Sequence, residues 1–147
     1  MHPVLHVLAT AQVLEKAGQR LFRPHGLTVA QFNVLNLLSD QPEGRRASDL
    51  ARALVVDASN VTGLLKRMKA EGLLRERENA ADRRQHVVIL TPKGQRAWEA
   101  ANEAYCRSLA VVDAALSPSE RKTTQRVLQK MVAAAAPTPT QTGPGPS

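Results

Sequence analysis

The spacing of hydrophobic residues predicts helices along most of this chain. From residue 4 to residue 22, small and apolar side chains recur every three or four positions, and Pro24 ends the pattern. Thr28 and Gln31 then match a capping box, in which each side chain bonds the backbone N–H of the other residue. The apolar stripe after that box is Phe32, Leu35 and Leu38. We therefore expect a long first helix and a second helix that begins at Thr28.

The following segment predicts two helices in close succession. Ser48 is expected to cap a short third helix, with Asp49 in its positive first turn. The inward face of that helix is Leu50, Ala51 and Leu54. The stretch "DASNVTGLLKRMKAEGLL" predicts a fourth helix, with Asp57 as its N-cap and Gly72 at its end. Two helices joined by a short turn are typical of a helix-turn-helix.

A β-hairpin is predicted directly after the fourth helix. Residues 73–78 and 86–90 are short enough to be strands, and "NAADRRQ" between them is polar and turn-like. A helix pair followed at once by a hairpin indicates a winged helix-turn-helix. We therefore expect a mainly α fold in which the fourth helix is placed to enter a DNA major groove.

Two further helices are predicted after the hairpin. Thr91 caps the first of them, and Pro92 occupies its first position, where proline fits best. Its apolar stripe is Trp98, Ala101, Tyr105, Leu109, Val112 and Leu116. The sequence "SPSE", beginning at Ser117, is another capping box and starts the last helix. The stripe of that helix is Val127, Leu128, Met131, Val132 and Ala135. Residues 137–147 have low complexity and are expected to be disordered.

The fourth helix has two distinct faces when its residues are placed about 100° apart. One face is apolar: Val61, Leu64, Leu65 and Met68. The opposite strip contains Ser59, Gly63, Lys66 and Ala70, flanked by Thr62 and Arg67. Gly63 is therefore expected to point away from the core, although glycine costs a helix about 1 kcal/mol relative to alanine. Either an exposed glycine is tolerated there, or the helix backbone must approach a partner closely.

Positive charge is concentrated around the hairpin. The chain has a net charge of +7, and residues 66–96 contain nine basic and four acidic side chains, a net +5. Such an excess fits a polyanionic partner, either nucleic acid or an anionic membrane. No apolar run approaches the ~20 residues of a membrane span, and residues 1–18 lack the pattern of a signal peptide. We therefore expect a cytoplasmic protein.

The sequence offers few residues for metal or covalent chemistry. Cys106 is the single cysteine, so no internal disulfide can form, and a small packing residue is expected there rather than a redox sensor. The four histidines have no metal-ligand spacing with one another or with Cys106. No glycine-rich phosphate loop follows a strand, and no nucleophilic triad has a supporting motif. We expect no metal, no cofactor and no enzymatic activity.

Four motifs resemble the MarR family of bacterial transcriptional regulators. These are "LTVAQFNVLNLL", "ASDLARALVVDASNVTGLLKRMKAEGLL", "DRRQHVVILTPKG" and the flanking long helices, which together cover residues 4–135. The resemblance implies an effector-responsive repressor that binds double-stranded DNA as a homodimer. It implies one winged-helix domain at 1–136, with a DNA-binding lobe at 28–96 and dimerisation helices at 4–22 and 97–136. We expect no membrane binding, because the apolar stripes of the helices are committed to the core and the dimer.

The resemblance also assigns DNA-binding residues. It places in the recognition helix Ser59, Asn60, Thr62, Gly63, Lys66 and Arg67. In the wing, Asp82 would orient arginine side chains and Arg84 would enter the minor groove, while Arg83 and Lys93 complete the DNA-binding set. The sequence departs from the family at Lys66 and Lys69, where relatives often have acidic residues.

Two questions stay open at the level of sequence. Many relatives bind small aromatic acids between the DNA-binding lobe and the dimer helices, so a small aromatic or anionic effector is implied. Arg23, His25 and Trp98 fit such a cleft, but they equally fit surface charge, turn polarity and a core aromatic, and no ligand-binding residue is assigned. The alternative function is a winged-helix protein–protein interaction module without specific DNA binding. Direct, salt-dependent binding to duplex DNA distinguishes the two.

Overall fold

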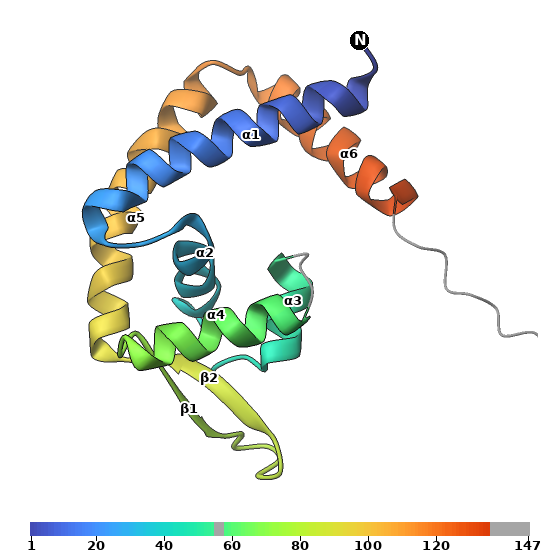
Figure 1. Ribbon diagram of the computed structural model, residues 1–147. Helices are drawn as coiled ribbons and strands as arrows, with labels where there is room; N and C mark the ends of the chain where they lie inside the picture. Colours follow the sequence, from blue (N-terminus) through green and yellow to red (C-terminus); the bar gives the residue numbers. More distant parts are fainter. Residues whose placement is uncertain (55–57, 136–147) are drawn as a thin grey trace, which may run out of the picture. The chain divides into compact units, whose positions relative to one another are not determined.

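The computed structural model describes residues 1–54 and 58–135, which form a mainly helical protein with one β-hairpin (Figure 1). The elements in chain order are α1 (Pro3–Phe22), the 3-10 turn η1 (Arg23–His25), α2 (Val29–Leu38), α3 (Ala47–Leu54), α4 (Ala58–Ala70), β1 (Leu74–Glu78), β2 (His86–Leu90), α5 (Pro92–Ala114) and α6 (Pro118–Ala135). This order confirms the predicted winged helix-turn-helix. The chain divides into two compact units, Met1–Arg107 and the residues from Ser108 onward. The predicted cap at Asp57 and the tail at 137–147 lie outside the described residues.

The predicted helix caps are confirmed at three positions. At α2, the Gln31 N–H donates to the Thr28 hydroxyl at 3.1 Å and the Thr28 N–H donates to the Gln31 side chain at 2.9 Å. The Gly94 N–H donates to the Thr91 hydroxyl at 3.0 Å, one turn into α5. Ser117 and Glu120 form the second capping box. These bonds satisfy backbone donors that a helix start leaves without partners.

The expected cap at Ser48 is wrong. Ser48 lies inside α3, and the backbone N–H groups of Asp49 and Leu50 both donate to the carbonyl oxygen of Arg46 at 3.1 Å. Arg46 therefore occupies the N-cap position. The chain arrives there from a β-bridge between Arg45 and Val88 of β2, and this tertiary contact determines where α3 can begin.

The core of the unit Met1–Arg107 is built around α2. Its fully buried side chains are Phe32, Val34, Leu35 and Leu38. Phe22, at the end of α1, stacks on Phe32 with ring centroids 4.1 Å apart, and the ring of Tyr105 lies 5.0 Å from Phe32. The helix-turn-helix adds buried Leu50, Val61, Leu65 and Met68. The predicted apolar stripes of α2, α3 and α4 thus form one continuous core.

The wing is anchored at its base by the loop between α2 and α3. In the hairpin, Leu74 pairs with Leu90, and β2 forms the additional bridge to Arg45. Gly44, with φ of +80°, lies so close to β2 that a Cβ there would be 2.5 Å from Ile89 Cγ2. Arg77 of β1 donates to the Pro42 carbonyl at 3.1 Å. Both strands of the wing are thereby tied to the loop that precedes α3.

The end of α4 and the start of α5 are packed against each other. Gly72 has φ of +74° and ends α4 as predicted. The Thr91 hydroxyl donates to the Gly72 carbonyl at 2.6 Å, and Lys93 Nζ donates to the Glu71 carbonyl at 2.7 Å. A Cβ at Gly94 would overlap the carbonyl oxygen of Leu73. Glycine is required at position 94 because the two backbones are in contact there.

Gly94→Ala is therefore expected to lower the free energy of unfolding by about 1–3 kcal/mol, the usual cost of overpacking. Urea unfolding at a fixed protein concentration measures the change. The matched control is Gly63→Ala, also within a helix, which should raise the free energy of unfolding by up to about 1 kcal/mol. Wild-type stability in Gly94→Ala would contradict the close contact.

Candidate nucleic-acid interface

Helix α4 has one buried face and one exposed face, as its sequence predicts. Val61, Leu65 and Met68 are at most 3% exposed, and Leu64 is half-buried against the core. The exposed side chains are Ser59, Asn60, Thr62, Lys66 and Arg67, all of them predicted DNA-binding residues. The structure therefore brings these five side chains together on the accessible side of one helix.

Gly63 lies at the edge of this exposed face. A Cβ added to it would meet only the Arg67 guanidinium, at 3.7 Å, so packing within the chain does not require glycine. Gly63 also lines a groove of about 520 Å³. The groove is bordered by Ala30, Asn33, Leu54, Ser59, Asn60, Val61, Leu64 and Arg67. The helix backbone is thus accessible at Gly63.

The cationic side chains of α4 differ in their partners. Lys69 pairs with Glu76 of β1 at 2.5 Å, which offsets much of its charge. In the described part of the chain, no carboxylate forms an ion pair with Lys66 or Arg67. Lys69 thus connects α4 to the wing, and Lys66 is available to an anionic partner.

The tip of the wing is organised by Asp82. Its Oδ1 accepts hydrogen bonds from the Arg84 backbone N–H at 3.0 Å and from Arg84 Nε at 3.3 Å. The pKa of Asp82 is lowered mainly by the backbone N–H of Arg84, then by the side chains of Arg84 and Gln85. The Arg84 side chain is 92% exposed, and Arg83 beside it is exposed too. The tip presents two guanidinium groups, one of them directed by a carboxylate.

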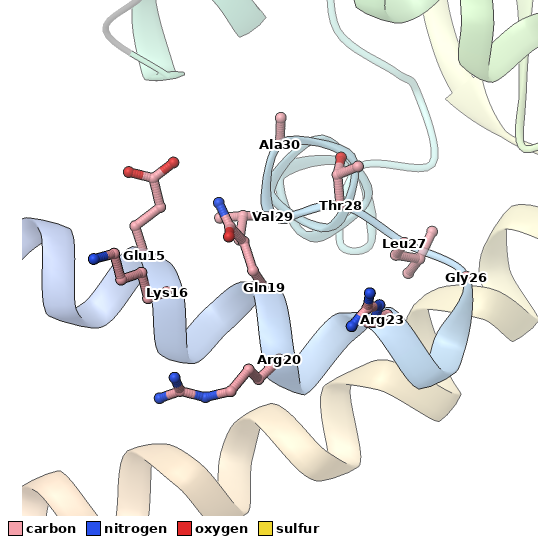
Figure 2. Close-up of a pocket in the computed structure, with 10 residues that line it drawn as sticks. All are labelled: Glu15, Lys16, Gln19, Arg20, Arg23, Gly26, Leu27, Thr28, Val29 and Ala30. Carbon is pink, nitrogen blue, oxygen red and sulfur yellow. The ribbon is translucent and has the colours of Figure 1, made fainter.

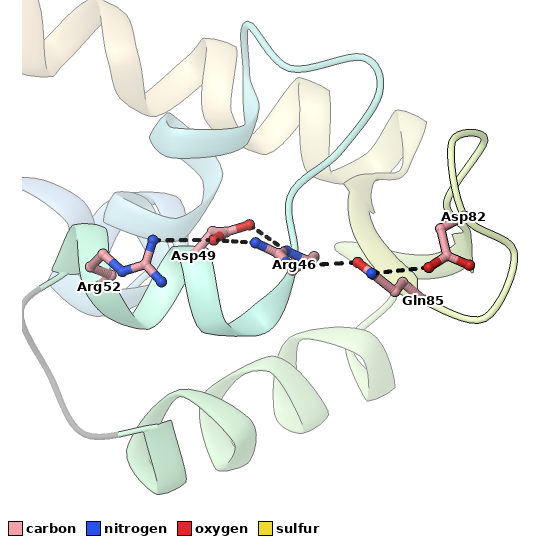
Figure 3. A network of polar contacts seen from close by, with 5 residues as sticks. All are labelled: Arg46, Asp49, Arg52, Asp82 and Gln85. Carbon is pink, nitrogen blue, oxygen red and sulfur yellow. Dashed lines mark hydrogen bonds and ion pairs between the residues drawn. The ribbon is translucent and has the colours of Figure 1, made fainter.

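A chain of polar contacts runs from this tip to α3 (Figure 3). Gln85 Nε2 donates to Asp82 Oδ2 at 3.1 Å, and Gln85 Oε1 accepts from Arg46 Nη1 at 3.5 Å. Arg46 binds both carboxylate oxygens of Asp49 at 2.8 and 3.1 Å, and Arg52 lies 3.5 Å from the same group. Sequence analysis missed Arg46 and Gln85, because their contact joins positions far apart in the chain and has no local signal.

Lys93 lies beside the end of α4 rather than free in solvent. Its ammonium donates to the Glu71 carbonyl, and the Glu71 carboxylate accepts from Gln31 Nε2 at 2.9 Å. An ammonium has three donors, so Lys93 keeps capacity for a phosphate. The starts of α2 and α5 are thereby both joined to the C-terminal end of α4.

A second groove lies between α1 and α2 (Figure 2). It has a volume of about 770 Å³ and is lined by the cations Lys16, Arg20 and Arg23, with one acid, Glu15. Polar Gln19 and Thr28 also face it. Arg23, which by sequence fits either an effector cleft or surface charge, lines this groove, whereas Trp98 Nε1 donates to Asn36 of α2 at 3.1 Å.

Two features are absent from the described residues. None of the helices there combines the length and apolar character needed to cross a membrane. No group of three or more histidine, cysteine or acidic residues in this part of the chain is arranged to hold a metal ion.

Comparison with known proteins identifies similar regulators. A sequence model described as the MarR family matches residues 25–85. The transcriptional activatory protein BadR of Rhodopseudomonas palustris is 38% identical over 91 residues, covering 60% of this chain and 52% of BadR. The homoprotocatechuate degradative operon repressor of Escherichia coli is 26% identical over 137 residues, covering 90% of each chain.

A solved structure shows the same fold over nearly the whole chain. The M. tuberculosis transcriptional regulator MOSR in complex with DNA matches with a TM-score of 0.74 and 28% identity, covering 92% of this chain and 99% of that one. The chain spans about half the length of the curated relatives that it matches at 35–38% identity.

Asp82 should stay ionised to lower pH than an ordinary aspartate, whose pKa is 3.8. A lowered pKa in the folded state means that the hydrogen bonds favour the carboxylate. These hydrogen bonds contribute fully to the order of the wing above the pKa of Asp82 in the unfolded protein, about 4. The contribution is lost as pH falls through the pKa of Asp82 in the folded protein. An NMR titration of the Asp82 carboxyl carbon measures this pKa.

Arg84→Ala removes one hydrogen-bond donor to Asp82 and keeps the backbone N–H, so it should raise the pKa of Asp82 part of the way to its ordinary value. An unchanged pKa would contradict the side-chain contact.

Proposed function

We propose that this chain belongs to the MarR family, whose sequence model matches residues 25–85, and that it is a sequence-specific transcriptional regulator that binds double-stranded DNA as a homodimer. The observation that carries the proposal is the exposed face of α4, where small, hydroxyl and cationic side chains lie together opposite a buried apolar face. The regulatory names of BadR and of the Escherichia coli repressor support it, as does the fold shared with DNA-bound MOSR. We infer a cytoplasmic repressor; the Escherichia coli relative, which matches over 90% of both chains, is named a repressor.

Helix α4 is the element suited to the major groove. The hydroxyl groups of Ser59 and Thr62 can bond phosphates or base edges, and Lys66 carries a charge that no carboxylate in the described residues offsets. Gly63 has no side chain to hold the helix away from the duplex. Asn60 and Arg67 extend the same surface with an amide and a guanidinium, the groups that pair with adenine and guanine.

The wing is the element suited to the minor groove. A narrow minor groove concentrates negative potential and attracts arginine. Arg84 fits this role because it is almost fully exposed and Asp82 directs its guanidinium. We assign Arg83 and Lys93 to phosphate contacts, which add affinity without sequence preference.

A protein-interaction module is the competing function, and DNA binding itself separates the two. Duplexes selected from a random pool should be bound more tightly than unselected duplexes, with an affinity that falls steeply with salt. Failure to enrich any sequence would favour the interaction module.

Exposed apolar side chains support a homodimer. Helix α1 exposes between 43% and 65% of Val4, Leu5, Leu8, Val13 and Leu14. The second unit exposes Leu109, Val111, Val112, Val127, Leu128 and Val132. Exposed apolar patches mark sites of interaction with a partner. A second copy of the chain fits because two recognition helices are needed to read two half-sites one turn of DNA apart.

The groove between α1 and α2 supports an anionic effector. Its three cations outnumber its single acid, and Leu27 and Val29 add apolar lining (Figure 2). A small aromatic carboxylate would satisfy both properties, because ligand sites combine apolar walls with a few placed charges. We propose this class of molecule as the signal that releases the repressor.

Gly63→Ala should raise thermal stability and weaken DNA binding at the same time. Alanine favours the helix by about 1 kcal/mol, but its methyl group would lie between the helix and the duplex. The expected loss of binding free energy is about 1–3 kcal/mol, the scale of one base contact. Melting and binding to a selected duplex are measured at one salt concentration. Gly63→Leu should weaken binding further without unfolding the protein. Unchanged affinity in both variants would show that Gly63 does not face DNA.

Leu8→Glu should weaken self-association about 10-fold or more, because a carboxylate would be buried against apolar side chains. Analytical ultracentrifugation over a concentration series measures the dimer dissociation constant. Gln12→Glu adds the same charge to α1 at an exposed polar position and serves as the control. Equal effects of the two variants would show that the dimer contact lies elsewhere. A monomeric wild type would exclude the dimer.

A further inference from the structure

We infer that Gln85 and Arg46 act together as a strut that sets the direction of the wing tip, and thereby of Arg84, relative to the helix-turn-helix. Neither residue belongs to the predicted DNA-binding set. The inference rests on the proposed DNA-binding function for its consequence, but the strut itself is a property of the free protein.

The α3 end of the strut is held in place by three contacts. Arg46 follows the bridge in which Val88 N–H donates to the Arg45 carbonyl at 2.8 Å, so its backbone is fixed to β2. Its carbonyl accepts the first hydrogen bonds of α3. Its guanidinium is fixed by both oxygens of Asp49. This two-point contact uses Nε and Nη2 and directs the remaining nitrogen, Nη1, to Gln85.

Gln85 is chemically suited to the centre of the strut because an amide both accepts and donates. Its oxygen faces the Arg46 guanidinium, and its nitrogen faces the Asp82 carboxylate (Figure 3). The backbone of Gln85 is also bonded across the loop, accepting from Asn79 N–H at 2.8 Å. A glutamate would keep the first side-chain contact and repel Asp82. An apolar side chain would lose both contacts.

The strut reaches Arg84 through Asp82. One carboxylate oxygen of Asp82 accepts from Gln85, and the other accepts from the backbone and side chain of Arg84. Below the tip, the strands of the hairpin are tied to the helix-turn-helix through Arg77, the Lys69–Glu76 ion pair and the Arg45 bridge. Without the strut, the loop 79–85 would lose its side-chain connection to α3.

The effect should appear in DNA affinity rather than in stability. Exposed polar contacts contribute little to global folding. A loop that is already ordered, however, loses less conformational entropy when it binds. Gln85 is uncharged, so its removal releases no counterions and should leave the salt dependence of binding unchanged. An unchanged salt dependence therefore distinguishes a strut from a direct contact between Arg46 and a phosphate.

The DNA experiment compares Gln85→Ala, Arg46→Lys and their combination on one selected duplex. Gln85→Ala should weaken binding about 2- to 10-fold with an unchanged salt slope and melting temperature. Arg46→Lys keeps the charge but cannot bind Asp49 and Gln85 together, so it should cause a similar loss. The double variant should lose no more than either single variant. Gln95→Ala, the same change at a half-buried position of α5 outside the proposed DNA-binding set, should bind as wild type.

Coupling to Arg84 provides the decisive comparison. If the strut acts by directing Arg84, Gln85→Ala should have no further effect in an Arg84→Ala background. A full additional loss there, or wild-type binding by Gln85→Ala, would overturn the inference.

A measurement without DNA keeps the strut testable if the wild type binds no duplex. Gln85→Ala and Arg46→Lys should both increase the backbone mobility of residues 82–84 in ¹⁵N relaxation, whereas Gln95→Ala should not. Wild-type mobility in both variants would refute the strut. Absence of DNA binding together with increased mobility would refute only the proposed function.

Discussion

Burial of one face of α4 is the constraint on which the rest of the DNA-binding lobe depends. Val61, Leu65 and Met68 enter the core around α2, and this fixes the rotation of α4 about its axis. Residues at other angles on the helix are then necessarily exposed. Ser59, Thr62 and Lys66 owe their accessibility to this packing. Gly63 on the same side is tolerated because burial of the apolar face, rather than local helix propensity, stabilises α4.

The wing is held in two physically different ways. Its base is tied by backbone contacts, the Arg45 bridge and the close approach of Gly44, which leave little freedom. In the described structure, its tip is connected to α3 through side chains, Asp82 and Gln85 of the loop and Arg46 at the start of α3. Backbone pairing suits a part that must not move. Exposed polar contacts suit a tip that must meet a duplex and can be reordered at small energetic cost.

The two ends of α4 are also held differently. Gly72, Thr91 and Lys93 bind its C-terminal end tightly to α5, and Gln31 joins the same end to the start of α2 through Glu71. Thr28, which caps α2 together with Gln31, also lines the cationic groove. The groove that we propose for an effector and the helix that we propose for DNA are thus joined by a short series of hydrogen bonds.

The sequence by itself determined the elements of this protein and the faces of its helices. Capping boxes at Thr28 and Ser117, proline at the start of α5 and the apolar period of α4 are local signals, because the groups involved lie within one helical turn. The structure confirms each of them. The DNA-contacting roles of residues 59–67, 83, 84 and 93 stay predictions that binding experiments must test.

Only the tertiary structure decided the contacts between elements. The start of α3 was misplaced at Ser48 because the bridge from Arg45 to β2 determines it, and no signal near Ser48 reports that bridge. The contacts of Arg46 with Gln85 and of Lys69 with Glu76 join long polar side chains from different elements. Such side chains have many rotamers and no periodic pattern, so their partners are set by where the packed core brings the backbones together.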